Sequence, residues 1–449
     1  MFKSLSVLAS VLGFVILFSI QSATGADPEW REKQEALFKQ IDLKYGDVIE
    51  KADANKIDGL VPPQILGWLK KGYMVNMRIG EFKYDVEADD KWMNASRKNE
   101  GKFKIGSAGN VVEVATGKAP SWVYGVPFPD FDLKNDPDGP LKFMYNRQVC
   151  QMRGRTMTAD FSLEWIGRKG FERSVQCLWT EYMFWGSDKP EPNPGKHRYL
   201  FINSVTKPYD LAGIAQLTYR KLSGSSDDFY VFIPAIRRVK KMSGANRSDP
   251  YVGSDLTIDD GGGFAGQQNS MKWRFIEEKV GLMSVEEPDT MSTSKLSQTS
   301  DGTWRIKLDY EDAMRVGWQE KGWKGATWAP VRAVWVPRVL EIIEGTPIDP
   351  YYNSGKTVYW VDKVTYHTAF KIIWDRAGEY WKSIVFHPRC LEWAGRKAYH
   401  GGGASGYVVF DEKLNHATAV RIGPGHLWLD DPKLTPQMFT VENLRTMGK

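Results

Sequence analysis

Apolar residues recur about every four positions near the N-terminus and about every second position beyond it. The spaced apolar positions predict a helix from about Trp30 to Ile41. A second helix is predicted from Pro63 to Lys71, because proline suits a first turn and Gly72 stands where a C-terminal cap belongs. These residues predict a short helical segment ahead of the rest of the chain.

Beyond residue 75 apolar and polar side chains alternate, which is typical of half-buried β-strands. The predicted strands are 174–179, 216–220 with its partner 229–233, 303–308, 333–343, 357–361, 368–374, 407–410 and 418–422. Short polar turns separate them and no long helical pattern intervenes, so we expect antiparallel sheet rather than an alternating α/β fold. Since no linker divides the strand series, the expected organisation is a helical segment over 26–75 that packs on the sheet of one domain over 76–449.

The first 25 residues have the pattern of a secretion signal. Lys3 precedes an apolar stretch from Leu5 to Ile20, which is short for a bilayer-spanning helix. The small residues Ala23-Thr24-Gly25 follow, so we expect cleavage before Ala26 and a destination outside the cytoplasm. An uncleaved membrane anchor is the alternative.

Composition excludes several classes of protein. Among 449 residues, 42% are hydrophobic and 26% charged, which fits a globular chain. Lys and Arg number 60 against 55 Asp and Glu, and a net charge of +5 is too small a bias to indicate nucleic acid as a partner. Cys150, Cys177 and Cys390 are too few for a disulfide framework. One pair could form in an oxidising compartment, and the sequence does not say which.

Local motifs predict neither catalytic residues nor a metal site nor a cofactor. The sequence contains no CxxC, HExxH or GxSxG motif. The segment 261–266 matches a glycine-rich dinucleotide pattern, but Asp259 and Asp260 precede it and no apolar-faced helix follows. We therefore interpret it as a loop.

Residues 229–260 carry the densest signal in the chain. An aromatic strand ends in four cations, and a loop rich in glycine and aspartate follows it. The cations are Arg237, Arg238, Lys240 and Lys241, and the acids of the loop are Asp255, Asp259 and Asp260. Ion pairs that tie the loop to the strand are the favoured interpretation. A polar rim around a ligand mouth and a weak cation site are the alternatives.

This stretch resembles the outer-membrane lipoprotein-sorting-like (LolA/LolB-like) proteins of Gram-negative bacteria. In those proteins an aromatic strand reaches P-A-x-R-R-V and then D-x-x-x-G-S-D. The matching residues here are Pro234, Ala235, Arg237, Arg238, Val239, Asp249, Gly253, Ser254 and Asp255. Within that superfamily the chain is similar to the periplasmic domain-of-unknown-function family 1329, with further support from 124–129, 136–140, 261–266 and 356–374.

The resemblance implies a mainly β fold: a curved antiparallel sheet that forms an incomplete (half) barrel, with helices across its concave face. It implies a protein that is soluble in the periplasm after signal cleavage and that is not an enzyme. In the lipoprotein carriers the cavity holds acyl chains, so a lipid or another hydrophobic small molecule is the implied ligand. An inner-membrane permease of the resistance-nodulation-division type and an outer-membrane protein are the implied partners.

A curved sheet that does not close leaves inward apolar side chains available to a guest. The candidate lining residues are Leu217, Tyr219, Phe232, Trp304, Ile306, Trp335, Trp360, Phe370 and Trp374. Arg237 and Arg238 are candidates for contact with an anionic head group. About ten buried methylenes would contribute roughly 8 kcal/mol before the cost of association, which predicts reversible binding.

The sequence therefore predicts a periplasmic carrier that serves transport to or from the outer membrane, with two alternatives. A secreted hydrolase acting on glycan or ester would explain the 18 tryptophans, but no local motif supports it. An outer-membrane β-barrel would suit aromatic-rich strands. The chain ends in Arg445-Thr446-Met447-Gly448-Lys449, without the terminal aromatic residue expected of such barrels.

Overall fold

The computed structural model describes residues 28–81, 90–151, 153–286, 295–307, 314–388, 391–393, 399–400 and 404–446. The secretion signal predicted for residues 1–25 and Cys390 lie outside this part of the chain. Cys150 and Cys177 are both buried free thiols. The domain boundaries expected from the sequence stay a prediction.

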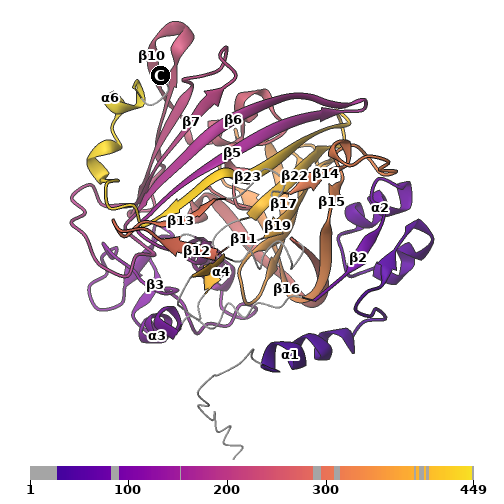
Figure 1. Ribbon diagram of the computed structural model, residues 1–449. Coiled ribbons are helices and arrows are strands. Elements are labelled where there is room, and N and C mark those ends of the chain that lie inside the picture. Colours follow the sequence, from indigo (N-terminus) through magenta and orange to yellow (C-terminus); the bar gives the residue numbers. More distant parts are fainter. Residues whose placement is uncertain are drawn as a thin grey trace, which may run out of the picture.

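One strongly curved antiparallel sheet dominates the molecule (Figure 1). Its strands are β5 (Thr156–Gly167), β6 (Gly170–Met183), β7 (His197–Lys207), β8 (Ala215–Lys221), β9 (Asp228–Ile233), β10 (Arg238–Met242), β11 (Met271–Glu286), β16 (Ala333–Pro347), β17 (Ser354–Asp362), β18 (Thr368–Asp375), β19 (Tyr380–Pro388), β22 (Ala404–Asp411) and β23 (His416–Leu429). Backbone pairing orders them β10-β9-β8-β7-β6-β5-β23-β22-β19-β18-β17-β16-β11. Strands β10 and β11 end this order, and no pairing among the described residues joins them. The sheet is therefore not closed into a barrel.

Short strands extend the sheet at two places. Beside β23 lie β13 (Trp304–Lys307), β12 (Lys295–Gln298), β20 (Leu391–Trp393) and β21 (Tyr399–His400). Beside β16 lie β2 (Met77–Ile79) and β1 (Val48–Ile49). The pairs β12–β20 and β2–β16 are parallel, so the whole sheet is mixed. Separate two-stranded sheets are formed by β3 (Phe103–Ile105) with β4 (Val111–Glu113) and by β14 (Arg315–Val316) with β15 (Pro330–Val331).

The helices are short. The α-helices are α1 (Pro28–Phe38), α2 (Pro63–Lys71), α3 (Asp90–Lys98), α4 (Gly139–Gln151) and α6 (Val441–Leu444). The 3-10 helices are η1 (Lys51–Ile57), η3 (Pro234–Ile236), η4 (Gly244–Ser248), η5 (Tyr251–Gly253), η6 (Ile258–Asp260), η7 (Gln268–Ser270), η9 (Gly317–Gln319) and η10 (Pro436–Met438). The predicted bounds of α2 are confirmed, and Gly72 caps it with a φ of 75°. None of the helices in the described ranges is both long and apolar enough to cross a bilayer.

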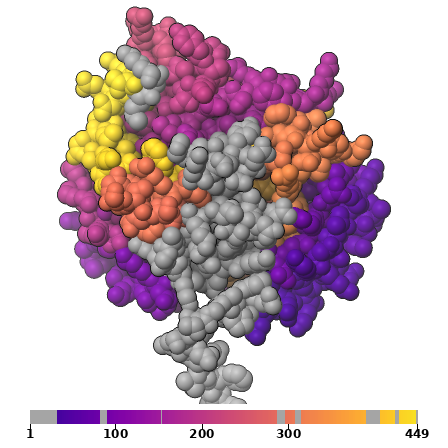
Figure 2. Space-filling model, viewed as in Figure 1, coloured from indigo at the N-terminus to yellow at the C-terminus, as the bar shows by residue number. Residues whose placement is uncertain are grey.

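We call the face of the sheet that lines the central cavity the inner face and the opposite one the outer face. The N-terminal helices cover the outer face around β16 to β22, where Trp68 of α2 packs edge-on against Trp328 and Phe410. In Figure 2 this N-terminal segment (indigo) lies beside the segment before β15 (orange), where the amide of Ala326 donates to the carbonyl of Tyr73. The C-terminal segment (yellow) lies on the other side of the molecule.

The inner face is covered by α4 and by residues 243–270, which we call the β10–β11 loop. Its 3-10 helices η4 to η7 carry the chain from one end of the strand order to the other. Helix α4 contacts η7 and β11 and contributes Gln148 and Gln151 to the cavity lining. The predicted fold class, mainly β with a curved sheet that forms an incomplete barrel, is confirmed. Of the helices expected across the concave face, α4 and the 3-10 helices of the loop lie there, whereas the N-terminal helices pack on the outer face.

Candidate functional site

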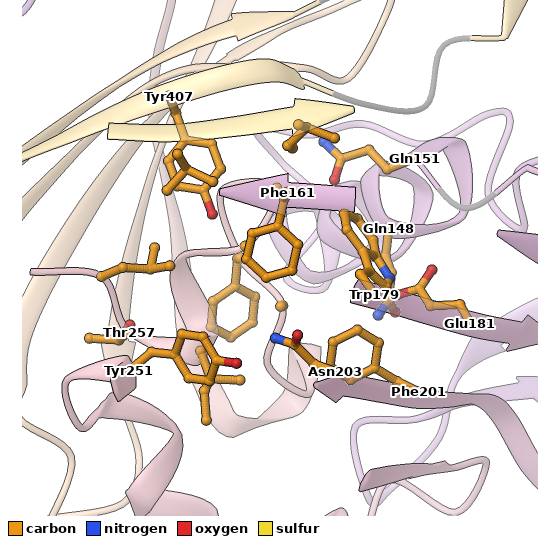
Figure 3. Close-up of a pocket in the computed structure, with 18 of the residues that line it drawn as sticks. Gln148, Gln151, Phe161, Trp179, Glu181, Phe201, Asn203, Tyr251, Thr257 and Tyr407 are labelled. Atoms are coloured by element: carbon orange, nitrogen blue, oxygen red, sulfur yellow. The ribbon is translucent and has the colours of Figure 1, made fainter. Parts of the chain in front are cut away.

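The curved sheet and the β10–β11 loop surround a cavity of about 160 Å³ (Figure 3). Aromatic and aliphatic side chains from distant parts of the sheet and from the loop line most of it, including Phe161, Phe201, Phe264, Phe386, Tyr407 and Ile422. These residues come from six separate elements, so the curvature of the sheet creates the cavity. Its chemistry is that of an apolar small-molecule site.

One wall of the cavity is polar, and it is built by β6, β7 and β8. Trp179 and Glu181 on β6, Asn203 on β7 and Thr218 on β8 all line the cavity. Figure 3 shows Trp179 and Glu181 grouped on one side of the cavity, with Asn203 and Phe201 next to them. The wall follows from strand periodicity, because alternate residues of neighbouring strands share one face.

Glu181 is the carboxyl group of this wall. Its side chain is buried, and burial raises the pKa of the carboxyl group to about 8, although the nearby Trp179 N–H and the charge of Arg220 lower it. Glu181 therefore carries its proton at pH 7, because an ionised carboxylate would lose its hydration in this apolar site.

The charges of two arginines near the cavity, Arg247 and Arg220, are compensated by carboxylates. Arg247 lines the cavity and places Nε 2.7 Å from Asp259 Oδ1, with Asp227 at 3.9 Å from Nη1. Burial lowers the pKa of the Arg247 guanidinium, but Asp259 and Asp227 outweigh that effect and raise the pKa above its usual value. Arg220 is paired in turn with Asp227 at 2.8 Å. Two cations thus face two anions.

The sequence favoured ion pairs between this loop and the basic strand before it, and that interpretation is wrong in its partners. The acids of the β10–β11 loop pair with other strands of the inner face and within the loop. Asp260 pairs with Lys371 of β18 at 2.5 Å. Asp255 accepts from Thr418 Oγ1 at 2.8 Å and lies 2.6 Å from His416 Nδ1.

Arg237 and Arg238, the predicted head-group contacts, are exposed at the end of the β9–β10 hairpin and do not line the cavity. Lys241 pairs with Asp228 at 2.8 Å. The basic run therefore lies on the surface, because its strand is the last in the sheet order and its tip projects beyond the neighbouring strands.

The glycine-rich segment 261–266 is a tightly packed turn. Gly263 has a φ of 98°, and a Cβ there would overlap Thr368 Oγ1 and Arg147 Nη2. The next residue, Phe264, is buried and lines the cavity. The glycines thus let the backbone approach the sheet closely enough to seat an aromatic ring in the lining.

Three of the predicted lining residues lie on the outer face of the sheet. Leu217, Tyr219 and Phe232 pack in a cluster with Phe439 and Leu444. The Tyr219 hydroxyl donates to the carbonyl of Phe439 at 2.8 Å. Alternation of apolar and polar residues distinguishes the two faces of a strand, but it does not indicate which face lines the cavity. On β8 the apolar face is the outer one, and the C-terminal segment covers it.

Other predicted residues lie beneath the N-terminal helices or beside the cavity. Trp335, Trp360 and Phe370 belong to the outer cluster that includes α2, and Trp335 also borders a surface groove near β1 and β2. Trp304 and Ile306 pack in a cluster with Met157, which lines the cavity, so they lie beside the lining.

Trp374 is half-buried, with Lys356 Nζ 4.4 Å from its ring centre. None of the eleven predicted residues is among those that line the central cavity. Their role in binding stays a prediction. Of the strands that carry them, only β8 and β18 contribute other residues to the cavity lining.

The sequence contained a signal for the polar wall. Val175, Cys177 and Trp179 were predicted to share one face of a strand, and Glu181 is the next residue on that face. A glutamate in line with buried apolar residues is a candidate for a functional group. Asn203 carried no such signal, because β7 was not predicted.

A hydrolase would need catalytic groups in the cavity. Among the described residues that line the cavity, Glu181 is the one that carries a carboxyl group. The described part of the chain also contains no cluster of three or more His, Cys, Asp or Glu side chains that could hold a metal ion. Glu278 and Glu341 oppose each other on β11 and β16, and burial together with Glu278 raises the pKa of Glu341 to about 7. That pair does not line the cavity.

An open curved sheet around a small apolar cavity defines the class of the protein, and comparison places it in a family. The model of the family described as "Protein of unknown function (DUF1329)" matches residues 48–445. The chain belongs to this family. No curated protein matches it.

Three solved structures are similar to the chain. A Vibrio parahaemolyticus domain described as a proposed outer membrane lipoprotein-sorting protein domain and a DUF1329 family protein from Desulfovibrio piger each share 14% identity with it. Each comparison covers 69% of this chain and 100% of the other, with a TM-score of 0.46. A LolA superfamily protein from Nitrosomonas europaea shares 10% identity over 68% of this chain and 98% of its own, with a TM-score of 0.39.

Proposed function

We propose that the protein is a periplasmic carrier that holds one small hydrophobic molecule in the cavity between the sheet and the β10–β11 loop. The observation that carries the proposal is an apolar cavity of about 160 Å³ at the centre of a folded domain. Well-packed interiors leave few voids larger than a water molecule, so a space of this size calls for an occupant.

The volume sets the size of the guest. An engineered protein cavity of about 150 Å³ binds benzene, so a six-carbon ring is the fitting scale here. The expected acyl chain of about ten methylenes is larger than this, and we narrow the cargo to a compact hydrophobic molecule.

The energetics favour reversible binding. Burying about six carbons contributes roughly 5 kcal/mol at about 0.8 kcal/mol each. Association costs about 4–15 kcal/mol, so the net affinity from the apolar body alone is weak. Weak binding suits handover between a donor and an acceptor, for which a permease of the inner membrane and an outer-membrane protein are the expected candidates.

Isothermal titration with toluene, together with mass spectrometry of an organic extract of protein purified from its native host, tests the proposal. We expect toluene to bind at a single site and the extract to contain a small hydrophobic compound. Val420→Phe, which fills space in the lining, should abolish toluene binding.

The matched control is Val114→Phe at an exposed position, which should leave toluene binding unchanged. Circular dichroism confirms that both variants fold. An empty extract together with no heat of toluene binding to the folded wild-type protein would overturn the carrier function.

A further inference from the structure

Four polar atoms of the β6–β7–β8 wall form no well-aligned hydrogen bond within the described structure, although the Trp179 N–H lies near enough to the Glu181 carboxyl group to lower its pKa. The four atoms are Trp179 Nε1, Glu181 Oε2, Asn203 Oδ1 and Thr218 Oγ1. The side chains of Glu181, Asn203 and Thr218 are all more than nine-tenths buried. Buried polar groups are nearly always paired, so four unpaired atoms on one wall of a cavity indicate a missing partner.

Strand register places the four side chains on one face of the sheet. Glu181 lies opposite Phe201, which lies opposite Thr218, so these three form one row across β6, β7 and β8. Trp179 lies opposite Asn203 in the next row of the same face. Neighbouring strands are about 4.8 Å apart, so Glu181 and Thr218, which β7 separates, lie about 10 Å apart at the backbone. A single polar group can therefore reach two or three of these side chains, and not all four at once.

The mixture of donors and acceptors on the wall indicates which polar group of a ligand would fit it. The Trp179 indole N–H can only donate, and the Asn203 amide oxygen can only accept. The Thr218 hydroxyl and the protonated Glu181 carboxyl can do either. A hydroxyl group, which donates one hydrogen bond and accepts others, matches this set better than a group that only accepts.

The charges around the wall disfavour an anion. Arg247, the guanidinium of the lining, is paired with Asp259 and lies near Asp227, which also pairs with Arg220. His367, a further cavity residue, is neutral because burial lowers its pKa to about 4. Among the residues that line the cavity, an anionic head group would thus meet no cation that lacks a carboxylate partner, and it would lie against the Glu181 carboxyl group.

We propose that the cavity selects compact hydrophobic molecules that carry an uncharged hydroxyl group, and that it rejects the corresponding carboxylates. The hydroxyl group binds the wall of Trp179, Glu181, Asn203 and Thr218 while the apolar body fills the aromatic part of the cavity (Figure 3). This inference rests on the proposed carrier function and assigns the chemical class of its cargo.

Calorimetric titration with phenol, toluene and benzoate at pH 7 tests the selection. Benzoate should bind at least about tenfold more weakly than phenol, as expected for a charge that finds no partner. Glu181→Leu should weaken phenol about tenfold without weakening toluene. Glu181→Gln, which keeps a donor and an acceptor, should leave phenol within about threefold of wild type.

Thr218→Val provides a second, nearly isosteric variant and should weaken phenol by about three- to tenfold. Glu100→Leu, at an exposed position outside the cavity, is the control and should change no affinity.

The outcomes separate the two proposals. If neither toluene nor phenol binds, the carrier function fails. If toluene binds but Glu181→Leu and Thr218→Val leave phenol unchanged, water satisfies the wall and the selection is wrong. Equal binding of benzoate and phenol would also overturn the selection, while leaving the carrier function intact.

Discussion

Glu181 couples the folding of the protein to pH. Its pKa is about 8 in the folded state against an ordinary value of 4.5, so the folded chain holds a proton that the unfolded chain releases between these values. Stability changes with pH in proportion to the protons bound by the unfolded state minus those bound by the folded state, and this difference is negative here. The contribution of Glu181 to stability therefore falls as pH rises from about 4.5 to about 8.

Glu181→Gln should remove this dependence. The wild-type protein is expected to lose up to about 1.4 kcal/mol of unfolding free energy per pH unit relative to the variant over that range. Urea unfolding of both proteins at pH 5, 6, 7 and 8 measures how the free energy of unfolding changes with pH. Glu100→Gln, at an exposed site, should keep the wild-type slope. Parallel profiles for wild type and Glu181→Gln would show that Glu181 is ionised in the folded protein.

Gly263 is required for both its backbone conformation and its lack of a side chain. We expect Gly263→Ala to cost at least about 2 kcal/mol, because it combines a positive φ with overlap against Arg147 and Thr368. Gly253 is the matched control, since its φ is 78° but no atom lies within 4 Å of an added Cβ. Gly253→Ala should cost only about 1 kcal/mol in the same denaturant titration. Equal costs would mean that the segment at Gly263 shifts to admit the methyl group.

At the scale of elements, the β10–β11 loop is held to the sheet by buried charge. The pair between Asp260 and Lys371 is almost fully buried on both sides. Burial disfavours the charge of each partner, but mutual attraction outweighs this, so the pKa of Asp260 is lowered and that of Lys371 is raised. Removal of one partner would leave the other charge buried without compensation.

Asp260→Asn should therefore destabilise the protein by about 3–5 kcal/mol. Asp53→Asn, which breaks the exposed pair with Lys56 at 2.9 Å, is the comparison and should cost less than about 1 kcal/mol. Thermal unfolding of the two variants gives the difference. Hydrogen exchange should also show faster exchange of η6 amides in Asp260→Asn, and unchanged exchange there would contradict the role of this pair in holding the loop.

The elements that the sequence predicted are those whose signals are local. Helix α2 has a proline at its start and a left-handed glycine at its end, and the β8–β9 hairpin has a polar turn between two alternating runs. Strand β7 has buried residues on both faces, so it lacks the alternation that reveals a half-buried strand. Strand β11 alternates less clearly because charged residues interrupt it over 277–279.

The lining of the cavity could not be predicted because it depends on distant parts of the chain. The outer face of β8 is apolar since the C-terminal segment covers it, and Tyr219 meets Phe439 across 220 positions of sequence. The inner face of the same strand carries Gln216 and Thr218. Hydrophobicity alone therefore indicated the wrong side of this strand as the side that faces the cavity.

At the scale of the whole molecule, ligand binding and unfolding are linked. Phe161 of β5, Phe386 of β19 and Phe264 of the β10–β11 loop all line the cavity, so its walls come from both halves of the sheet and from the loop. A guest therefore contacts elements that must separate together when the protein unfolds. Toluene at about 100 times its dissociation constant should stabilise the folded state by about 2.7 kcal/mol.

This stabilisation should appear as a shift of the whole thermal transition. With an unfolding entropy of about 2.1 cal/mol/K per residue over 449 residues, the midpoint should rise by about 3 °C. Scanning calorimetry with and without toluene measures the shift. Val114→Phe should keep it and Val420→Phe should lose it, because only the second substitution fills the cavity. A shift that survives in Val420→Phe would show that toluene binds elsewhere, since a filled cavity leaves no differential affinity between the folded and unfolded states.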